Sequence, residues 1–136
     1  MHKFIPHTAD IKFHVQARTI EGAFLESAMV LKKIIIENKK TKNKKNKKIQ
    51  IKGKDLESLL YNFLEEFLYL IDAKNFLFNE IKEIKIDEKN FKLTAVILGD
   101  DISNYKINNK VKAITYNDMI IKHEKDKWII EAVLDI

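Results

Sequence analysis

The spacing of apolar residues changes along this 136-residue chain, and the order of the changes constrains the fold more than any other feature. Residues 11–17 alternate apolar and polar side chains, which is the period of a half-buried strand. Residues 20–37 and 56–71 repeat apolar side chains every three or four positions, which predicts two amphipathic helices. Thr19 and Asp55 stand where N-caps of these helices are expected.

Strand patterns make up most of the rest of the chain. One lies between the two helices at residues 49–53, and five more follow, at 76–86, 91–98, 111–116, 119–124 and 128–136. Residues 99–110 read as a polar loop in which Asp100 and Asp101 are solvated. The order β-α-β-α-β-β-β-β-β predicts a single α+β domain over residues 1–136. We expect a two-layer architecture, with both helices packed on one face of a mixed, mostly antiparallel sheet.

Residues 39–48, KKTKNKKNKK, hold seven lysines and no acidic residue. The rest of the chain is slightly acidic, with 18 of the 25 basic residues and all 20 acidic ones. A run of like charges between two hydrophobic segments is typical of a solvated loop, so we expect a lysine-rich loop over 39–48. The alternative is weak, salt-sensitive binding of RNA, with Lys44, Lys45, Lys47 and Lys48 as the contacts.

Composition excludes several classes of chemistry. The chain has no cysteine, so it forms neither disulfides nor thiolate metal sites, and a reducing compartment such as the cytoplasm is expected. No apolar stretch has the length of a membrane span, so no membrane partner is expected. Gly22, Gly53 and Gly99 lie far apart, so no glycine-rich phosphate loop is present. We therefore expect no nucleotide to be bound by this chain alone.

The remaining candidates for a functional site are the carboxylates at two strand ends. Asp10 precedes the first strand, and Asp135 lies at the end of the last strand, followed by the α-carboxylate of Ile136. If the two strand ends are neighbours, their oxygens converge on a site that suits Ca²⁺ or Mg²⁺ better than Zn²⁺. His7 is a candidate to support this site as a ligand or proton carrier. The structural alternative is that Asp10 is a turn or cap residue and that His7 fixes the bend after Pro6.

Five segments in order and spacing resemble the archease family: HTADI at 7–11, TIEGAF at 19–24, DLESLLYNFLEEFLYLIDA at 55–73, VKAITYNDMII at 111–121 and WIIEAVLDI at 128–136. The resemblance spans nearly the whole chain and implies the α+β archease fold. It implies an accessory protein, not an enzyme, that activates the RtcB-type RNA 3′-phosphate ligase of tRNA splicing. Such an activator promotes guanylylation and multiple turnover of the ligase, and it contacts the tRNA halves only indirectly.

The same resemblance implies a divalent metal site, with calcium or magnesium as the ion and with Asp10, Asp135 and Ile136 as its ligands. His7 then supports the loop beside the site. One departure from the family pattern concerns Asn117, where the family often has histidine. Asparagine does not take up a proton as histidine does, so a proton-transfer role at that position is not carried over.

Overall fold

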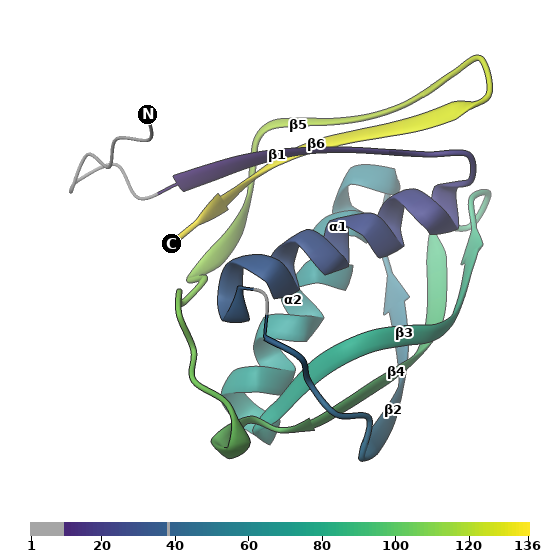
Figure 1. Cartoon of the computed structure of the whole chain (residues 1–136). Helices are drawn as coiled ribbons and strands as arrows, with labels where there is room; N and C mark the ends of the chain where they lie inside the picture. Colours follow the sequence, from purple (N-terminus) through teal and green to yellow (C-terminus); the bar gives the residue numbers. More distant parts are fainter. Residues whose placement is uncertain (1–9, 38) are drawn as a thin grey trace.

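The computed structural model describes residues 10–37 and 39–136, which form two α-helices, six strands and one short 3₁₀-helix (Figure 1). Their bounds are β1 Asp10–Ala17, α1 Ile20–Ile36, β2 Lys45–Lys52, α2 Leu56–Lys74, β3 Phe76–Asp87, β4 Lys92–Asp101, η1 Ile102–Asn104, β5 Ala113–Glu124 and β6 Lys127–Asp135.

Both helices begin at the N-caps that the sequence predicts. The Thr19 hydroxyl accepts a hydrogen bond from the backbone N–H of Gly22 at 3.0 Å. At the start of α2, the Asp55 carboxylate accepts from the backbone N–H of Ser58 at 2.7 Å, and the Ser58 hydroxyl accepts from the backbone N–H of Asp55, which completes a capping box. These local bonds fix the start of each helix independently of the rest of the fold.

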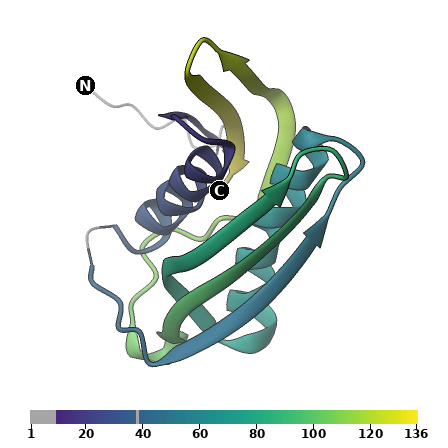
Figure 2. The same cartoon turned by 90° about the vertical axis from the view of Figure 1, so that its right-hand side faces the viewer.

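The six strands form two three-stranded sheets, in the orders β1-β6-β5 and β2-β4-β3, and every pair is antiparallel. The predicted α+β class is confirmed, but the strands do not form the single mixed sheet that we expected. Each helix contacts strands of both sheets, so the helices lie between the sheets instead of on one face of one sheet (Figures 1 and 2). The physical reason is that both helices carry apolar stripes wide enough to bury against two surfaces.

A chain of aromatic rings connects the layers of the core. Phe24 of α1 lies 5.8 Å from Phe63 of α2, measured between ring centroids. Phe63 meets Phe67 edge to face at 5.0 Å, and Phe67 reaches Phe78 of β3 at 4.2 Å. All four side chains are buried, so this chain links both helices to the second sheet.

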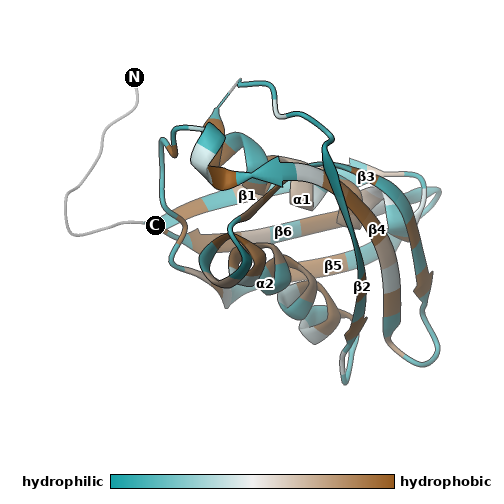
Figure 3. Ribbon diagram, turned by 90° about the horizontal axis from the view of Figure 1, so that it is seen from below, coloured by the Kyte–Doolittle hydropathy of each residue, from teal (hydrophilic) through white to brown (hydrophobic). Residues whose placement is uncertain are grey.

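The strand boundaries differ from the predicted ones most clearly in β5 and β2, and β4 also extends to Asp101, into the predicted loop. The runs 111–116 and 119–124, predicted as separate strands, belong to one strand, β5, whose register is interrupted between Thr115 and Ile120. The predicted loop 39–48 is shorter, because β2 begins at Lys45, where cross-strand pairing with β4 overrides the polar composition. Figure 3 shows that the first half of β2 is hydrophilic, whereas hydrophobic and hydrophilic residues alternate in its second half. Within the described residues, neither helix is long and apolar enough to cross a membrane.

Candidate functional site

The antiparallel pairing of β1 with β6 places Asp10 directly opposite Asp135. Opposite residues of an antiparallel pair point to the same face of the sheet. In the next pair, Leu134 is fully buried in the core opposite the half-buried Ile11, so the two aspartates project from the outer face. Asp10 is exposed and Asp135 is half-buried. The structure therefore pairs the two residues that the sequence singled out at opposite ends of the chain, and Figure 1 shows the start of β1 beside the end of β6.

The backbone at Asp135 pairs with a strand on each side, β1 on one and β5 on the other. Ala113 of β5 is its second cross-strand neighbour, and the backbone N–H of Lys112 donates a hydrogen bond to the Asp135 carbonyl at 2.7 Å. Ile136 is half-buried and packs against the core. These contacts fix the last residues of β6, so the Asp135 carboxylate projects from a positioned backbone.

The oxygen donors at this edge fit a hard divalent cation. Asp10 and Asp135 supply two carboxylates on one face, and a carboxyl or carbonyl oxygen of Ile136 is the third oxygen named from the sequence. The part of the chain that the structure describes contains no group of three or more His, Cys, Asp or Glu side chains that could hold a metal. Further ligands would therefore be backbone oxygens or water, which is usual for Mg²⁺ and Ca²⁺. His7 lies outside the described residues.

The next carboxylate along the same outer face belongs to Glu131, and neighbouring basic side chains already balance its negative charge. It accepts a hydrogen bond from His14 Nδ1 at 2.9 Å, and Lys12 Nζ lies 3.8 Å from its other oxygen. The hydrogen bond from His14, with the positive charge of Lys12 beside it, lowers the pKa of Glu131. His14 is exposed, as the alternation over residues 11–17 indicates for a polar position, and it pairs with Glu131.

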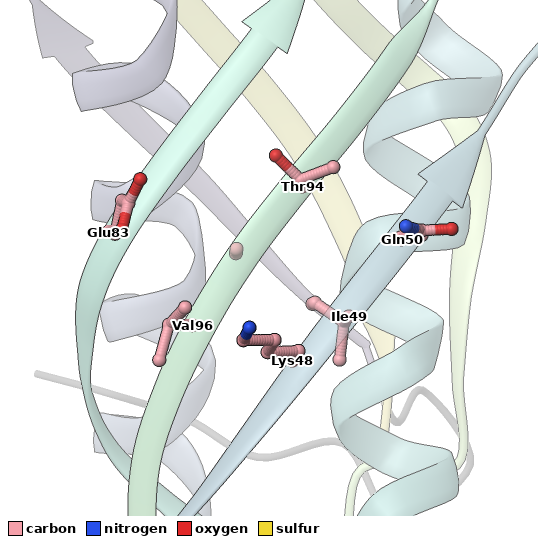
Figure 4. Close-up of a pocket in the computed structure, with 7 residues that line it drawn as sticks. Lys48, Ile49, Gln50, Glu83, Thr94 and Val96 are labelled. Atoms are coloured by element: carbon pink, nitrogen blue, oxygen red, sulfur yellow. The ribbon is translucent and has the colours of Figure 1, made fainter.

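The lysines proposed as RNA contacts do not form one surface. Lys45 and Lys47 point to the opposite face of β2 from Lys48, because side chains alternate along a strand. Lys45 Nζ lies 3.7 Å from an Asp101 carboxylate oxygen. Lys48 instead lines a hollow of about 210 Å³ on the outer face of the second sheet, with Gln50, Thr94 and Glu83 around it (Figure 4).

Asp100 is not the solvated loop residue that we expected. It lies in β4, is only 3% exposed, and accepts hydrogen bonds from the Tyr105 hydroxyl at 2.7 Å and from the backbone N–H of Asp101 at 2.8 Å. The bond from Tyr105 is the main reason that the pKa of Asp100 is lowered. The Tyr105 hydroxyl in turn accepts from the backbone N–H of Lys42 at 2.9 Å. This buried carboxylate therefore ties two loops to the end of β4, and no local pattern in the sequence indicates it.

The fold and site thus define a class of small α+β domain: two helices held between two antiparallel sheets, with a pair of carboxylates at the edge where the first and last strands meet. The family model that matches is the Archease protein family, over residues 2–136. The chain belongs to the archease family.

Similar proteins support this assignment along the whole chain. A protein archease from Methanosarcina barkeri is 35% identical, over 99% of this chain and 95% of that protein. A protein archease from Pyrococcus abyssi is 39% identical, over 96% of this chain and 94% of that protein. The solution structure of protein 1598 from Methanobacterium thermoautotrophicum superimposes with a TM-score of 0.79 at 27% identity, covering 97% of this chain and 96% of that one. An archease crystal structure from Thermotoga maritima has the same fold, with a TM-score of 0.66 at 21% identity, over 100% of this chain and 98% of that one.

Proposed function

We propose that this protein is an accessory protein that activates an RtcB-type RNA ligase in tRNA splicing, and that Asp10 and Asp135 are its working residues. Membership of the archease family suggests this role. One structural observation supports the assignment of the residues, namely the register that sets Asp10 opposite Asp135 on the outer face of the first sheet.

Two like charges placed directly opposite each other on a sheet destabilise it. In the described residues, neither Asp10 nor Asp135 takes part in an ion pair that would offset this repulsion. A divalent cation, calcium or magnesium, would supply the missing positive charge, with Asp10, Asp135 and a carboxyl or carbonyl oxygen of Ile136 as its protein ligands. When bound, such an ion would supply electrostatic stabilisation of phosphate charge, which would favour guanylylation of the ligase by GTP.

The chain's own contribution is to hold the two carboxylates at one end of the first sheet, where β1 begins and β6 ends. The pairing of β1 with β6 fixes their spacing, and the hydrogen bond from the Lys112 N–H to the Asp135 carbonyl fixes the end of β6. We propose that this end of the sheet faces the ligase active site, so that the protein assists the chemistry of its partner without carrying out a reaction of its own.

The test is the turnover of the cognate ligase on broken tRNA with GTP and Mn²⁺. It compares no added protein, the unmodified protein, and the Asp10→Ala and Asp135→Ala variants. Asp126→Ala is the matched control, because Asp126 is an exposed aspartate in the turn at the other end of β6. We expect stimulation by the unmodified protein and by Asp126→Ala, and its loss in the other two variants while they remain folded.

Two results would contradict the proposal. Full stimulation by a folded Asp10→Ala variant would remove the acidic pair from the mechanism. Absence of stimulation by the unmodified protein would contradict the activator role itself.

A further inference from the structure

A surface hollow of about 460 Å³ lies beside the first turn of α2, away from the residues assigned to the ligase role. It is lined by the end of β2 with the turn that follows it, by the first two turns of α2, and by the interrupted part of β5. The lining residues are Lys52, Gly53, Lys54, Ser58, Asn62 and Tyr116. Its size is within the usual range of small-molecule binding sites, about 300–1,000 Å³.

The interruption of β5 directs one aromatic side chain toward this hollow. Thr115 pairs with Val133 and Ile120 pairs with Glu131, so residues 116–119 lie opposite a single residue of β6. The backbone N–H of Asn117 donates to the Thr115 hydroxyl at 3.2 Å, which holds the irregular segment in place. Insertions of this kind re-aim side chains and often adjoin functional sites.

The side chain that the interruption redirects is Tyr116. Its ring stacks on Tyr61 of α2, with 4.4 Å between centroids and 6° between planes. Tyr116 is nevertheless 53% exposed, and Tyr116, not Tyr61, lines the hollow. The pair therefore forms a supported aromatic platform whose accessible member is Tyr116. A ring held in this way loses little conformational entropy when a planar ligand stacks on it.

The backbone that carries Lys52 and Lys54 is pinned to the rest of the fold. The Lys52 carbonyl accepts from the Asn62 side chain at 2.8 Å, and the Lys54 N–H donates to the Ser58 hydroxyl at 2.7 Å. Between them, Gly53 packs so closely on α2 that a Cβ atom there would lie 2.6 Å from the backbone nitrogen of Leu59. Glycine is thus required for this close approach.

The two lysines that line the hollow give it a positive charge. Across the described part of the chain, neither Lys52 nor Lys54 takes part in an ion pair. Asp55 is the adjacent carboxylate in the sequence, and its side chain caps the N-terminus of α2 through the backbone N–H of Ser58. Its negative charge stabilises the helix end, where the macrodipole is positive. Together with desolvation, which is the main cause, it also contributes to the raised pKa of Tyr116.

From these observations we infer that the hollow binds a nucleotide, with the base stacked on Tyr116 and a phosphate group held by Lys52 and Lys54. Proteins also bind single-stranded nucleic acid through aromatic rings next to basic side chains, without a glycine-rich loop. The absence of such a loop, which led us to expect no bound nucleotide, therefore does not exclude this site. The nucleotide is either part of a single-stranded RNA or a free nucleotide. This site shares no residue with the Asp10–Asp135 pair, so it does not depend on the ligase role.

The test measures binding of two probes by the full-length protein: a short fluorescent oligouridylate, by anisotropy, and GMP, by calorimetry. We expect Tyr116→Ala to weaken binding by about 5- to 100-fold, because one stacking contact is lost. Tyr116→Phe should bind as the unmodified protein does, since it keeps the ring. Lys52→Gln with Lys54→Gln should weaken binding of the oligonucleotide and lower its salt slope by about one per phosphate contact.

Two controls keep the result interpretable. Tyr69→Ala removes a tyrosine of α2 that is 51% exposed and does not line the hollow, and it should bind normally. Lys44→Gln with Lys48→Gln tests the lysine run instead. Since Tyr116→Ala also removes the stack on Tyr61, its fold is checked by thermal unfolding, and the double lysine variant provides an independent test.

Loss of binding in Tyr116→Ala and in the Lys52 and Lys54 double variant supports the inference, and the probe that binds identifies the source of the nucleotide. The inference is overturned if the unmodified protein binds neither probe at low salt, or if only the Lys44 and Lys48 variant weakens binding. It is also overturned if Tyr116→Ala weakens binding to the ligase but not to either probe, because the platform would then be a protein contact.

Discussion

Replacing Asp10 by asparagine should stabilise the protein when divalent cations are absent. The register places Asp10 opposite Asp135, and side chains so paired have Cβ atoms about 4.5–5.5 Å apart. Two unit charges about 5 Å apart in water repel each other by roughly 0.8 kcal/mol. The value for water applies because Asp10 is exposed. We therefore expect Asp10→Asn to raise the free energy of unfolding by about 0.5–1 kcal/mol at low salt, and less as salt screens the repulsion.

The sign of this effect should reverse when calcium is present. A ligand at a hundredfold excess over its dissociation constant stabilises the folded state by about 2.7 kcal/mol. The unmodified protein should gain stability in this way through Asp10 and Asp135, whereas Asp10→Asn lacks one of the two carboxylates and should gain much less. The unmodified protein is then the less stable of the two in chelator and the more stable in calcium.

The assay is urea unfolding with and without calcium, followed by the fluorescence of Trp128, the single tryptophan of the chain and a residue only 9% exposed. Asp126→Asn is the control, because it changes the net charge equally in the turn between β5 and β6. The reasoning is refuted if Asp10→Asn is destabilised in chelator while Asp126→Asn is not. It is equally refuted if calcium stabilises Asp10→Asn as much as the unmodified protein.

Three further predictions concern buried residues, namely Asp100, Phe67 and Gly99. Asp100→Asn should destabilise the protein most above about pH 5. The pKa of Asp100 is lowered in the folded state, so its contribution is complete above the unfolded-state pKa of about 3.9 and is lost as pH falls through the lower folded value. Urea unfolding at several pH values would contradict this if the difference from the unmodified protein did not shrink in acid. Phe67→Ala removes a fully buried ring and should cost about 3–5 kcal/mol, whereas Tyr69→Ala on the same helix should stay within about 0.5 kcal/mol, both measured by urea unfolding. Gly99→Ala would place its Cβ against the backbone carbonyl of Leu77 in the neighbouring strand, and should lower the unfolding free energy by about 1–3 kcal/mol or more.

Some features of this protein were determined by the sequence alone because they depend on neighbours a few residues apart. The starts of both helices are of this kind, since Thr19 and Asp55 cap backbone groups that are three residues away. The alternation in residues 11–17 likewise indicated which face of β1 meets the core. The family resemblance named Asp10 and Asp135 together, and the two strand ends that carry them proved to be neighbours.

Other features were decided only by the tertiary structure. The division of the strands into two sheets depends on pairings between distant segments, such as β1 with β6, and an alternating pattern does not specify its partner. The stack of Tyr116 on Tyr61 and the burial of Asp100 depend on such contacts as well. Cross-strand register also brings Asp10 and Asp135 to one edge, because hydrogen bonding between the first and last strands joins residues that the chain itself keeps far apart.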